Sequence, residues 1–117
     1  MNICINGSRG YKNYSQMKLT LDIELKDKSD VTFILGGARG ADQLAERYAK
    51  ENKIPFKVFK PDWDKHGRAA GIMRNKVMIS QSNHLISFWD GKSRGTKHAI
   101  DHARMNSIPV TVVETIA

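Results

Sequence analysis

The sequence has a single cysteine, Cys4, and only three prolines among its 117 residues. One cysteine leaves no partner for an internal disulfide, so a fold held together by such bonds is excluded. No apolar run approaches the roughly 20 residues that cross a bilayer, and the N-terminus lacks the basic-then-apolar order of a secretory signal. We therefore expect a protein of the reducing cytoplasm with no membrane partner.

Aromatic residues are also scarce, at 8% of the chain, so no stacking platform for single-stranded nucleic acid is visible. The 40% hydrophobic content is nevertheless ordinary for a folded protein, and the length suits one domain spanning residues 1–117. Acidic residues are outnumbered, because 19 Lys and Arg face 12 Asp and Glu, which gives a net charge of +7. This balance either serves solubility alone or indicates an anionic partner, which would be nucleic acid or a phosphorylated small molecule.

Five short apolar runs alternate with segments of helical periodicity. Runs rich in β-branched residues predict strands, and apolar residues spaced by three and four predict helices. The predicted strands are residues 1–6, 31–35, 56–60, 84–89 and 110–113. The predicted helices are residues 13–28, 40–52, 68–80 and 96–105, with a polar loop at 61–67.

The segment 13–28 carries two competing patterns. Helical spacing links Tyr14, Met17 and Leu21, whereas Leu19, Leu21 and Ile23 alternate as in a strand. A helix is favoured, because parallel neighbouring strands need a crossover of this length between them. The inward-facing residues expected for the last two helices are Ala69, Ala70, Met73 and Val77, and then Ala99, Ile100 and Ala103.

This alternation predicts an α/β fold, a Rossmann-like three-layer sandwich. We expect a five-stranded parallel sheet of order 3-2-1-4-5 with helices on both faces. In such sheets a ligand lies beyond the carboxyl ends of the strands, where the order reverses. The loops 7–10 and 90–95 should face each other there, with the loop 36–40 beside the first.

A glycine-rich turn lies between the strand 31–35 and the helix that follows it. Gly36, Gly37 and Gly40 allow close backbone approach, and the helix N-terminus presents unpaired N–H groups with a positive partial charge. A strand, a glycine turn and a helix start together predict an anion site.

Arginines are concentrated at this edge, whereas lysines are spread along the chain. Guanidinium groups bind phosphate with two parallel hydrogen bonds, so the bias predicts a phosphate-binding rim. The alternative is that these loops are simply polar and exposed. The arginines in loops or early helical turns are Arg9, Arg39, Arg68, Arg74 and Arg94.

Acidic and aromatic residues also lie at the rim, and Asp42 and Trp63 each have two alternative roles. Asp42 in the first turn of its helix either stabilises the helix dipole or accepts ribose hydroxyls. Trp63 either stacks on a base or covers the core. Asp62 and Asp64 follow the third strand. Asp62 is the second candidate for binding ribose hydroxyls, and both are candidate carboxylates for catalysis.

No metal or cofactor motif is complete. Gly91, Lys92 and Ser93 resemble the end of a P-loop, but Ile86 stands where that motif needs glycine. His98 and His102 have zinc-like spacing without a third ligand, so we predict no metal site and no cofactor.

Five loop motifs, taken in order, resemble the SLOG superfamily, which joins DprA-type DNA-processing proteins to LOG phosphoribohydrolases. The resemblance is greatest to its small YspA/YpsA-related branch. The motifs are Gly7-Ser8-Arg9, GGARGAD at 36–42, Pro61-Asp62-Trp63, AAGIMRN at 69–75, and Gly95-Thr96.

The resemblance implies a Rossmann-like domain that binds nucleotides or nucleotide-derived signals, often as a homo-oligomer. It implies two phosphate loops, one at Gly7, Ser8 and Arg9 and one at GGARGAD. The residues that would complete the pocket are Arg74, Asn75, Gly95 and Thr96.

The chain departs from the LOG enzymes at their catalytic glutamate. That glutamate stands three residues after the threonine of a glycine-rich turn, and here Ala99 occupies the position. Whether the protein is an enzyme is therefore open. We favour binding of a nucleotide-type molecule by a sensor or sequestering protein. The alternatives are hydrolysis of an N-glycosidic or phosphate bond, and single-stranded nucleic-acid binding.

Overall fold

The computed structural model describes residues 1–115, which form a five-stranded parallel sheet of order β3-β2-β1-β4-β5. The predicted topology is confirmed. The strands are β1 (Asn2–Gly7), β2 (Thr32–Leu35), β3 (Phe56–Val58), β4 (His84–Trp89) and β5 (Val110–Glu114). The helices are α1 (Tyr14–Glu24), α2 (Ala41–Glu51), α3 (Trp63–His66), α4 (Ala70–Ser80) and α5 (Arg94–Met105).

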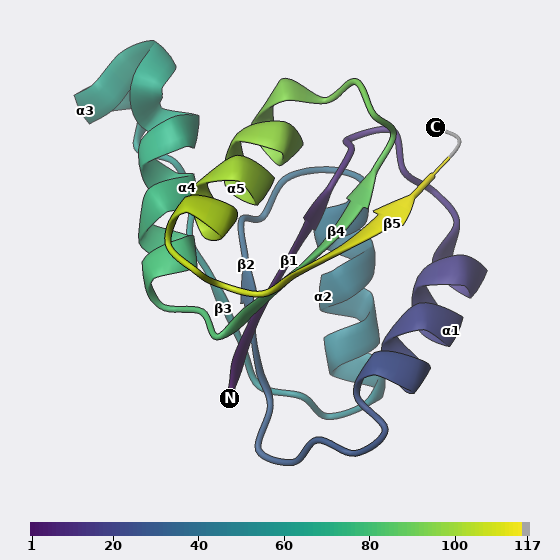
Figure 1. Cartoon of the computed structure of the whole chain (residues 1–117). Helices are drawn as coiled ribbons and strands as arrows, with labels where there is room; N and C mark the ends of the chain where they lie inside the picture. The colour runs from purple at the N-terminus through teal and green to yellow at the C-terminus, as the bar shows by residue number, and fades with distance from the viewer. Residues whose placement is uncertain (116–117) are drawn as a thin grey trace.

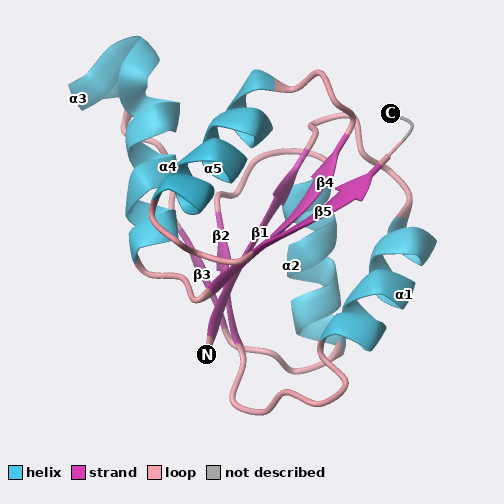
Figure 2. Ribbon diagram, in the orientation of Figure 1, coloured by secondary structure: helices cyan, strands magenta, loops and turns pink. Residues whose placement is uncertain are grey.

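Helices cover both faces of the sheet, with α1 and α2 on one side and α4 and α5 on the other (Figures 1 and 2). Successive strand residues point to opposite faces, so each strand supplies both cores. Ile3 and Ile5 of β1 pack with the α1–α2 layer, whereas Cys4 between them packs with the α4–α5 layer. Within residues 1–115, each helix is too short or too polar to cross a bilayer.

The helical interpretation of the ambiguous segment is confirmed. Met17 and Leu21 of α1 are fully buried, whereas Leu19 and Ile23 are 64% and 66% exposed. A strand would have placed Leu19, Leu21 and Ile23 on one face. The helix ends at Glu24, four residues earlier than predicted.

Between β3 and β4 the predicted loop at 61–67 is wrong, whereas the helix predicted at 68–80 is confirmed with a later start. The segment 61–67 is not a loop throughout, because Asp62 caps the short helix α3 by accepting a hydrogen bond from the Lys65 amide at 3.1 Å. A 3-10 turn at Gly67–Ala69 then precedes α4, which begins at Ala70. The polar residues of this segment suggested a loop, but the Asp62 side chain stabilises a helix start by capping it.

The inward face of α4 also differs from the prediction. Ala70 is buried as expected, but Ala69, Met73 and Val77 are exposed. Met78 and Ile79 fill the core instead, with Asn75 buried one turn before them. The helix is therefore turned so that its Arg74–Asn75 side reaches the carboxyl edge of the sheet. The inward face predicted for α5 (Ala99, Ile100 and Ala103) is confirmed.

The first two glycine loops are in direct backbone contact. Gly40 has φ +76°, and a Cβ built on it would lie 2.4 Å from the carbonyl oxygens of both Ser8 and Arg9. The Ala41 amide donates to the Ser8 carbonyl oxygen at 3.3 Å. Glycine at position 40 therefore sets the spacing between the loops after β1 and β2.

We expect Gly40→Ala to lower the free energy of unfolding by about 2 to 4 kcal/mol, because it adds both backbone strain and a steric clash. Gly91→Ala is the matched control, since Gly91 has φ +80° with nothing within 4 Å of its built Cβ. It should cost only about 1 kcal/mol. Urea denaturation of both variants measures the difference, and equal losses would contradict the close approach.

Candidate functional site

Loops from three strands meet where the strand order reverses. Ser8, directly after β1, donates its backbone N–H to the Phe88 carbonyl oxygen of β4 at 3.0 Å. Its hydroxyl accepts from the Asp90 amide at 3.1 Å, and it is almost completely buried. The predicted juxtaposition of the loops after β1, β2 and β4 is confirmed.

Two adjoining hollows lie at this edge, and they share Arg9, Ala38 and Arg74 as a common wall. The inner chamber has a volume of about 80 Å³, and the outer cleft one of about 380 Å³. The sequence-predicted residues in the inner chamber are Gly7, Arg9, Asp42, Arg74, Asn75, Gly95 and Thr96. Those in the outer cleft are Arg9, Gly36, Gly37, Arg39, Trp63 and Arg74.

Arg74 ties helix α4 to the loop after β2. Its Nη1 donates to the Gly36 carbonyl oxygen at 2.7 Å, and its Nε donates to Asn75 Oδ1 at 3.1 Å. Asn75 Nδ2 in turn donates to the Gly95 carbonyl oxygen at 3.3 Å. A Cβ at position 36 would lie 2.7 Å from Arg74 Nη1, so any larger residue there would displace the guanidinium from this position. Burial lowers the pKa of Arg74, and the neighbouring Asp42 charge opposes that shift.

Asp42 has one satisfied and one unsatisfied carboxylate oxygen. Its side chain is 6% exposed, and Oδ2 accepts from the Ala38 amide at 3.1 Å. Oδ1 is buried and finds no hydrogen-bond partner among residues 1–115. Burial raises the pKa of Asp42 to about 6, although the Ala38 hydrogen bond and the Arg74 charge act in the opposite direction. A role at the start of α2 accounts for the hydrogen bond to Oδ2, but it does not account for the buried, unpaired Oδ1.

The raised pKa makes stability depend on pH. An unfolded carboxyl ionises near 3.8, so the folded state holds a proton between about pH 4 and pH 6 that the unfolded state has lost. Stability therefore falls as the pH rises through this window and then stays level. The charged or titratable neighbours of Asp42 are Arg9, Arg74 and Cys4.

Asp42→Asn, which is neutral at every pH, should raise the free energy of unfolding at pH 8 by up to about 3 kcal/mol. The gain should nearly vanish at about pH 3, because Asp42 is then mostly protonated in both the folded and the unfolded state. Urea denaturation of wild type and variant at the two pH values measures this difference. A gain independent of pH would contradict a buried ionised carboxylate.

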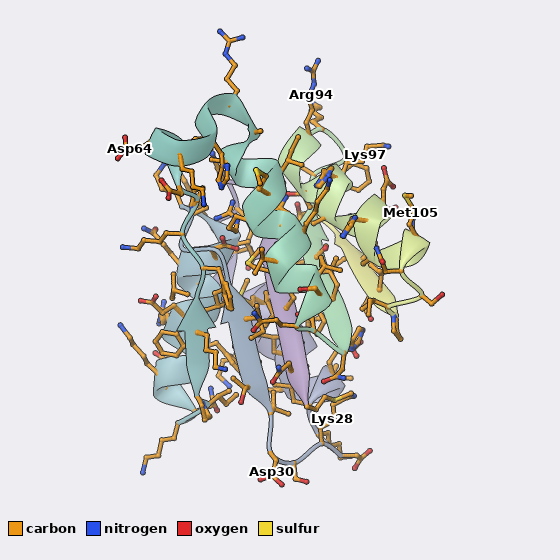
Figure 3. All side chains as sticks on the ribbon, turned by 90° about the vertical axis from the view of Figure 1, so that its left-hand side faces the viewer. Lys28, Asp30, Asp64, Arg94, Lys97 and Met105 are labelled. Atoms are coloured by element: carbon orange, nitrogen blue, oxygen red, sulfur yellow. The ribbon has the colours of Figure 1, made fainter. Side chains whose placement is uncertain are left out.

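Other predicted residues lie at the edge without lining either hollow. Ser8 and Gly40 hold the loops together as described above, and Asp62 caps α3. Figure 3 shows Arg94 and Asp64 at this end of the molecule, with side chains directed outward. Arg68, in the 3-10 turn, is exposed and contributes to neither hollow. Only three of the five rim arginines therefore converge.

The sequence reasoning missed several residues that line the hollows, among them Asn6 and Lys60. Asn6, the sixth residue of the chain, lies in the inner chamber and accepts a hydrogen bond from the Ser87 hydroxyl at 2.5 Å. The sequence signal that could have identified Asn6 is a polar residue at the end of an otherwise apolar strand. Lys60 lines the outer cleft just after β3 and adds a positive charge there.

Position 99 lies in the apolar core. Ala99 is fully buried among residues of the α4–α5 layer, including Cys4 and Ile100. Among the residues that line the two hollows, Asp42 is the single acid. His98 and His102 stack with ring centroids 6.0 Å apart, and residues 1–115 contain no group of three His, Cys, Asp or Glu arranged for a metal ion.

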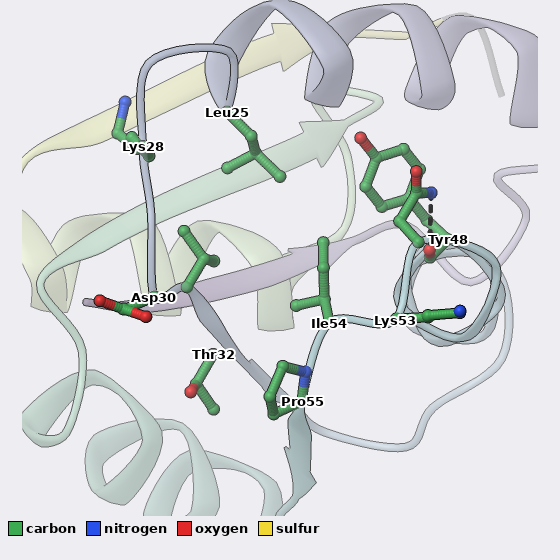
Figure 4. Close-up of a pocket in the computed structure, with 10 residues that line it drawn as sticks. Leu25, Lys28, Asp30, Thr32, Tyr48, Lys53, Ile54 and Pro55 are labelled. Atoms are coloured by element: carbon green, nitrogen blue, oxygen red, sulfur yellow. Dashed lines mark hydrogen bonds between the residues drawn. The ribbon is translucent and has the colours of Figure 1, made fainter.

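A larger hollow of about 560 Å³ lies at the opposite, amino end of the sheet (Figure 4). Leu25 and Asn52, the C-caps of α1 and α2, lie in its lining. Helix C-termini carry a negative partial charge, which disfavours an anion. Although Lys28 and Lys53 also line it, this hollow offers neither arginine nor a helix N-terminus, and the candidate site remains at the carboxyl edge.

Comparison with known proteins agrees with this architecture. A model of the YspA, cpYpsA-related SLOG family matches residues 1–66. The chain belongs to this family. A relative of similar length, the Gene 61 protein of Mycobacterium phage D29, is 32% identical over 115 residues, and the match covers 92% of each chain.

Two solved structures of DNA processing protein A share the fold. The Streptococcus pneumoniae protein superposes with a TM-score of 0.79 at 13% identity, over 97% of this chain and 50% of its own. The Helicobacter pylori protein, whose structure concerns a single-stranded DNA binding mode, gives 0.72 at 22% identity, over 98% and 66%. The SLOG chain thus spans half to two thirds of these proteins, and identities this low show the fold alone.

Proposed function

We propose that this SLOG protein binds a nucleotide or a nucleotide-derived phosphate compound at the inner chamber and outer cleft. The observation that carries the proposal is the shared wall, where Arg9 and Arg74 lie beside a glycine loop and the N-terminus of α2. Both features favour a phosphate group. The side chain of Arg9 makes no hydrogen bond within residues 1–115, so its donors are available to a ligand.

The outer cleft has the size and lining for the rest of such a molecule. Its volume of about 380 Å³ falls within the range of small-molecule sites. Arg39 and Lys60 would hold further phosphates, and Trp63, which is 54% exposed, would stack on a base. A sensor and a sequestering protein would use the same contacts.

Binding is favoured over hydrolysis by the position of residue 99. The side chain at that position points into the α4–α5 core, away from both hollows, so the chain has no counterpart of the LOG glutamate. Asp64 and Asp62 line neither of these two hollows. Asp62 lines a neighbouring hollow with Lys60 and Arg74, and its Oδ1 already accepts the capping hydrogen bond of α3. Incubation with nucleoside monophosphates, followed by chromatography, should release no free base.

We expect Arg9→Ala to weaken the binding of nucleoside di- or monophosphates by roughly 10- to 100-fold, the usual loss of a charge-assisted contact. Stability should barely change, because Arg9 is exposed. Arg104→Ala, at an exposed position in the last turn of α5, removes the same charge away from the site and should leave affinity unchanged. Isothermal titration calorimetry measures both, after a thermal-shift panel of nucleotides, cyclic dinucleotides and ADP-ribose derivatives has found a ligand.

Single-stranded nucleic acid is the second candidate, favoured by the fold shared with the two DNA processing proteins and by the net charge of +7. The same basic groups would then contact successive backbone phosphates.

If three or four cationic side chains contact phosphates, affinity for a labelled oligothymidylate should fall roughly 30-fold between 50 and 200 mM salt, because counterions are released on binding. Fluorescence anisotropy measures this dependence. Salt-independent or undetectable binding would remove this candidate and leave the nucleotide proposal standing.

A further inference from the structure

The unsatisfied oxygen of Asp42 is the feature that the phosphate proposal leaves unused. Asp42 is only 6% exposed, and it lines the inner chamber together with Asn6 and Thr96. Buried polar atoms in folded proteins are nearly always hydrogen-bonded, and an exception calls for an explanation. A donor supplied by a ligand would satisfy Oδ1.

The distribution of charge separates the two hollows by chemistry. The outer cleft is lined by Arg39 and Lys60 in addition to the arginines of the shared wall, and by no acid. The inner chamber holds the carboxylate of Asp42. An ionised phosphate pressed against that carboxylate would be repelled, so phosphates belong at the shared wall and outward. The group beside Asp42 must instead donate hydrogen bonds.

The size of the inner chamber narrows the choice further. Its volume of about 80 Å³ is roughly a fifth of the 380 Å³ of the outer cleft, so the bulk of a nucleotide belongs in the outer cleft and only a small polar group in the inner chamber. A pair of sugar hydroxyls fits that space. Thr96, which also lines the chamber and whose hydroxyl lies 3.0 Å from that of Ser93, offers a second polar contact.

We propose that the inner chamber receives the ribose hydroxyls of the ligand and that Asp42 Oδ1 accepts a hydrogen bond from the 2′-hydroxyl. The proposal rests on the proposed function and specifies its ligand class as ribonucleotides. A 2′-deoxy ligand leaves Oδ1 buried and unpaired, so discrimination comes from the desolvated carboxylate.

Calorimetry with matched pairs tests the assignment. The probes are adenosine and guanosine 5′-diphosphates and their 2′-deoxy counterparts, titrated at pH 7.5, where Asp42 is ionised. Wild type should bind each ribonucleotide roughly 10- to 100-fold more tightly than its 2′-deoxy counterpart, the usual cost of leaving a buried acceptor without a partner. Equal affinities, or a preference for the deoxy form, would overturn the ribose assignment.

Asp42→Asn is the decisive variant, because the amide oxygen can still accept from the Ala38 N–H while the NH₂ group can offer the 2′-hydroxyl only a neutral hydrogen bond in place of the charge-assisted one. Its ribo-to-deoxy ratio should fall to within about threefold. Asp27→Asn, an exposed change in the turn after α1, should keep the wild-type ratio. An unchanged ratio in Asp42→Asn would place the discrimination elsewhere and refute the proposal.

The two levels of inference fail in different ways. If both sugar forms bind equally and Arg9→Ala weakens both, the nucleotide proposal stands and the ribose assignment is lost. If neither form binds and Arg9→Ala changes nothing, both are lost.

Discussion

The contact between the Arg74 guanidinium and the Gly36 backbone holds the candidate site together. Nη1 donates to the Gly36 carbonyl oxygen at 2.7 Å, and the missing side chain at position 36 provides the space. Through Arg74 and its neighbour Asn75, helix α4 is joined to the loops after β2 and β4. One side chain therefore brings together loops that come from different crossovers, and it forms part of both hollows.

Asp42 shows how a binding site and a stable fold can make opposing demands. The start of α2 favours a carboxylate, and Oδ2 meets the Ala38 amide there. Burial nevertheless raises the pKa of the group to about 6 and leaves Oδ1 without a partner among the described residues. A side chain selected for stability alone would not combine these features. The tension is what points to a ligand at this position.

Membership of the SLOG family and the position of Ala99 bear on different questions. The family match and the likeness to the DNA processing proteins concern the fold, a parallel sheet with helices on both faces. The core location of Ala99 concerns chemistry, because a carboxylate there would have to leave the apolar layer that contains Cys4 and Ile100. Fold and function thus separate within one chain, as is usual for Rossmann-like domains.

Sequence reasoning predicted the features that depend on local periodicity. Alternating apolar runs and helical spacing indicated the five strands, their order and the buried faces of α1 and α5. It failed at 61–67, where the side chain of Asp62 caps a short helix, and at α4, where Met73 and Val77 looked as apolar as Met78 and Ile79. Periodicity identifies apolar stripes on a helix. When a helix has two such stripes, the sequence does not show which one packs against the sheet.

The sequence by itself determined the parallel sheet, the glycine loops and the edge at which they gather, because strand and helix patterns are encoded over a few neighbouring residues. Only the tertiary structure decided which rim residues converge. Arg9, Arg39 and Arg74 line the hollows, whereas Arg68 and Arg94 do not, and Asn6 joins the inner chamber through its pairing with Ser87. Such choices depend on helix rotation and loop contact between residues far apart in the chain, which no local pattern records.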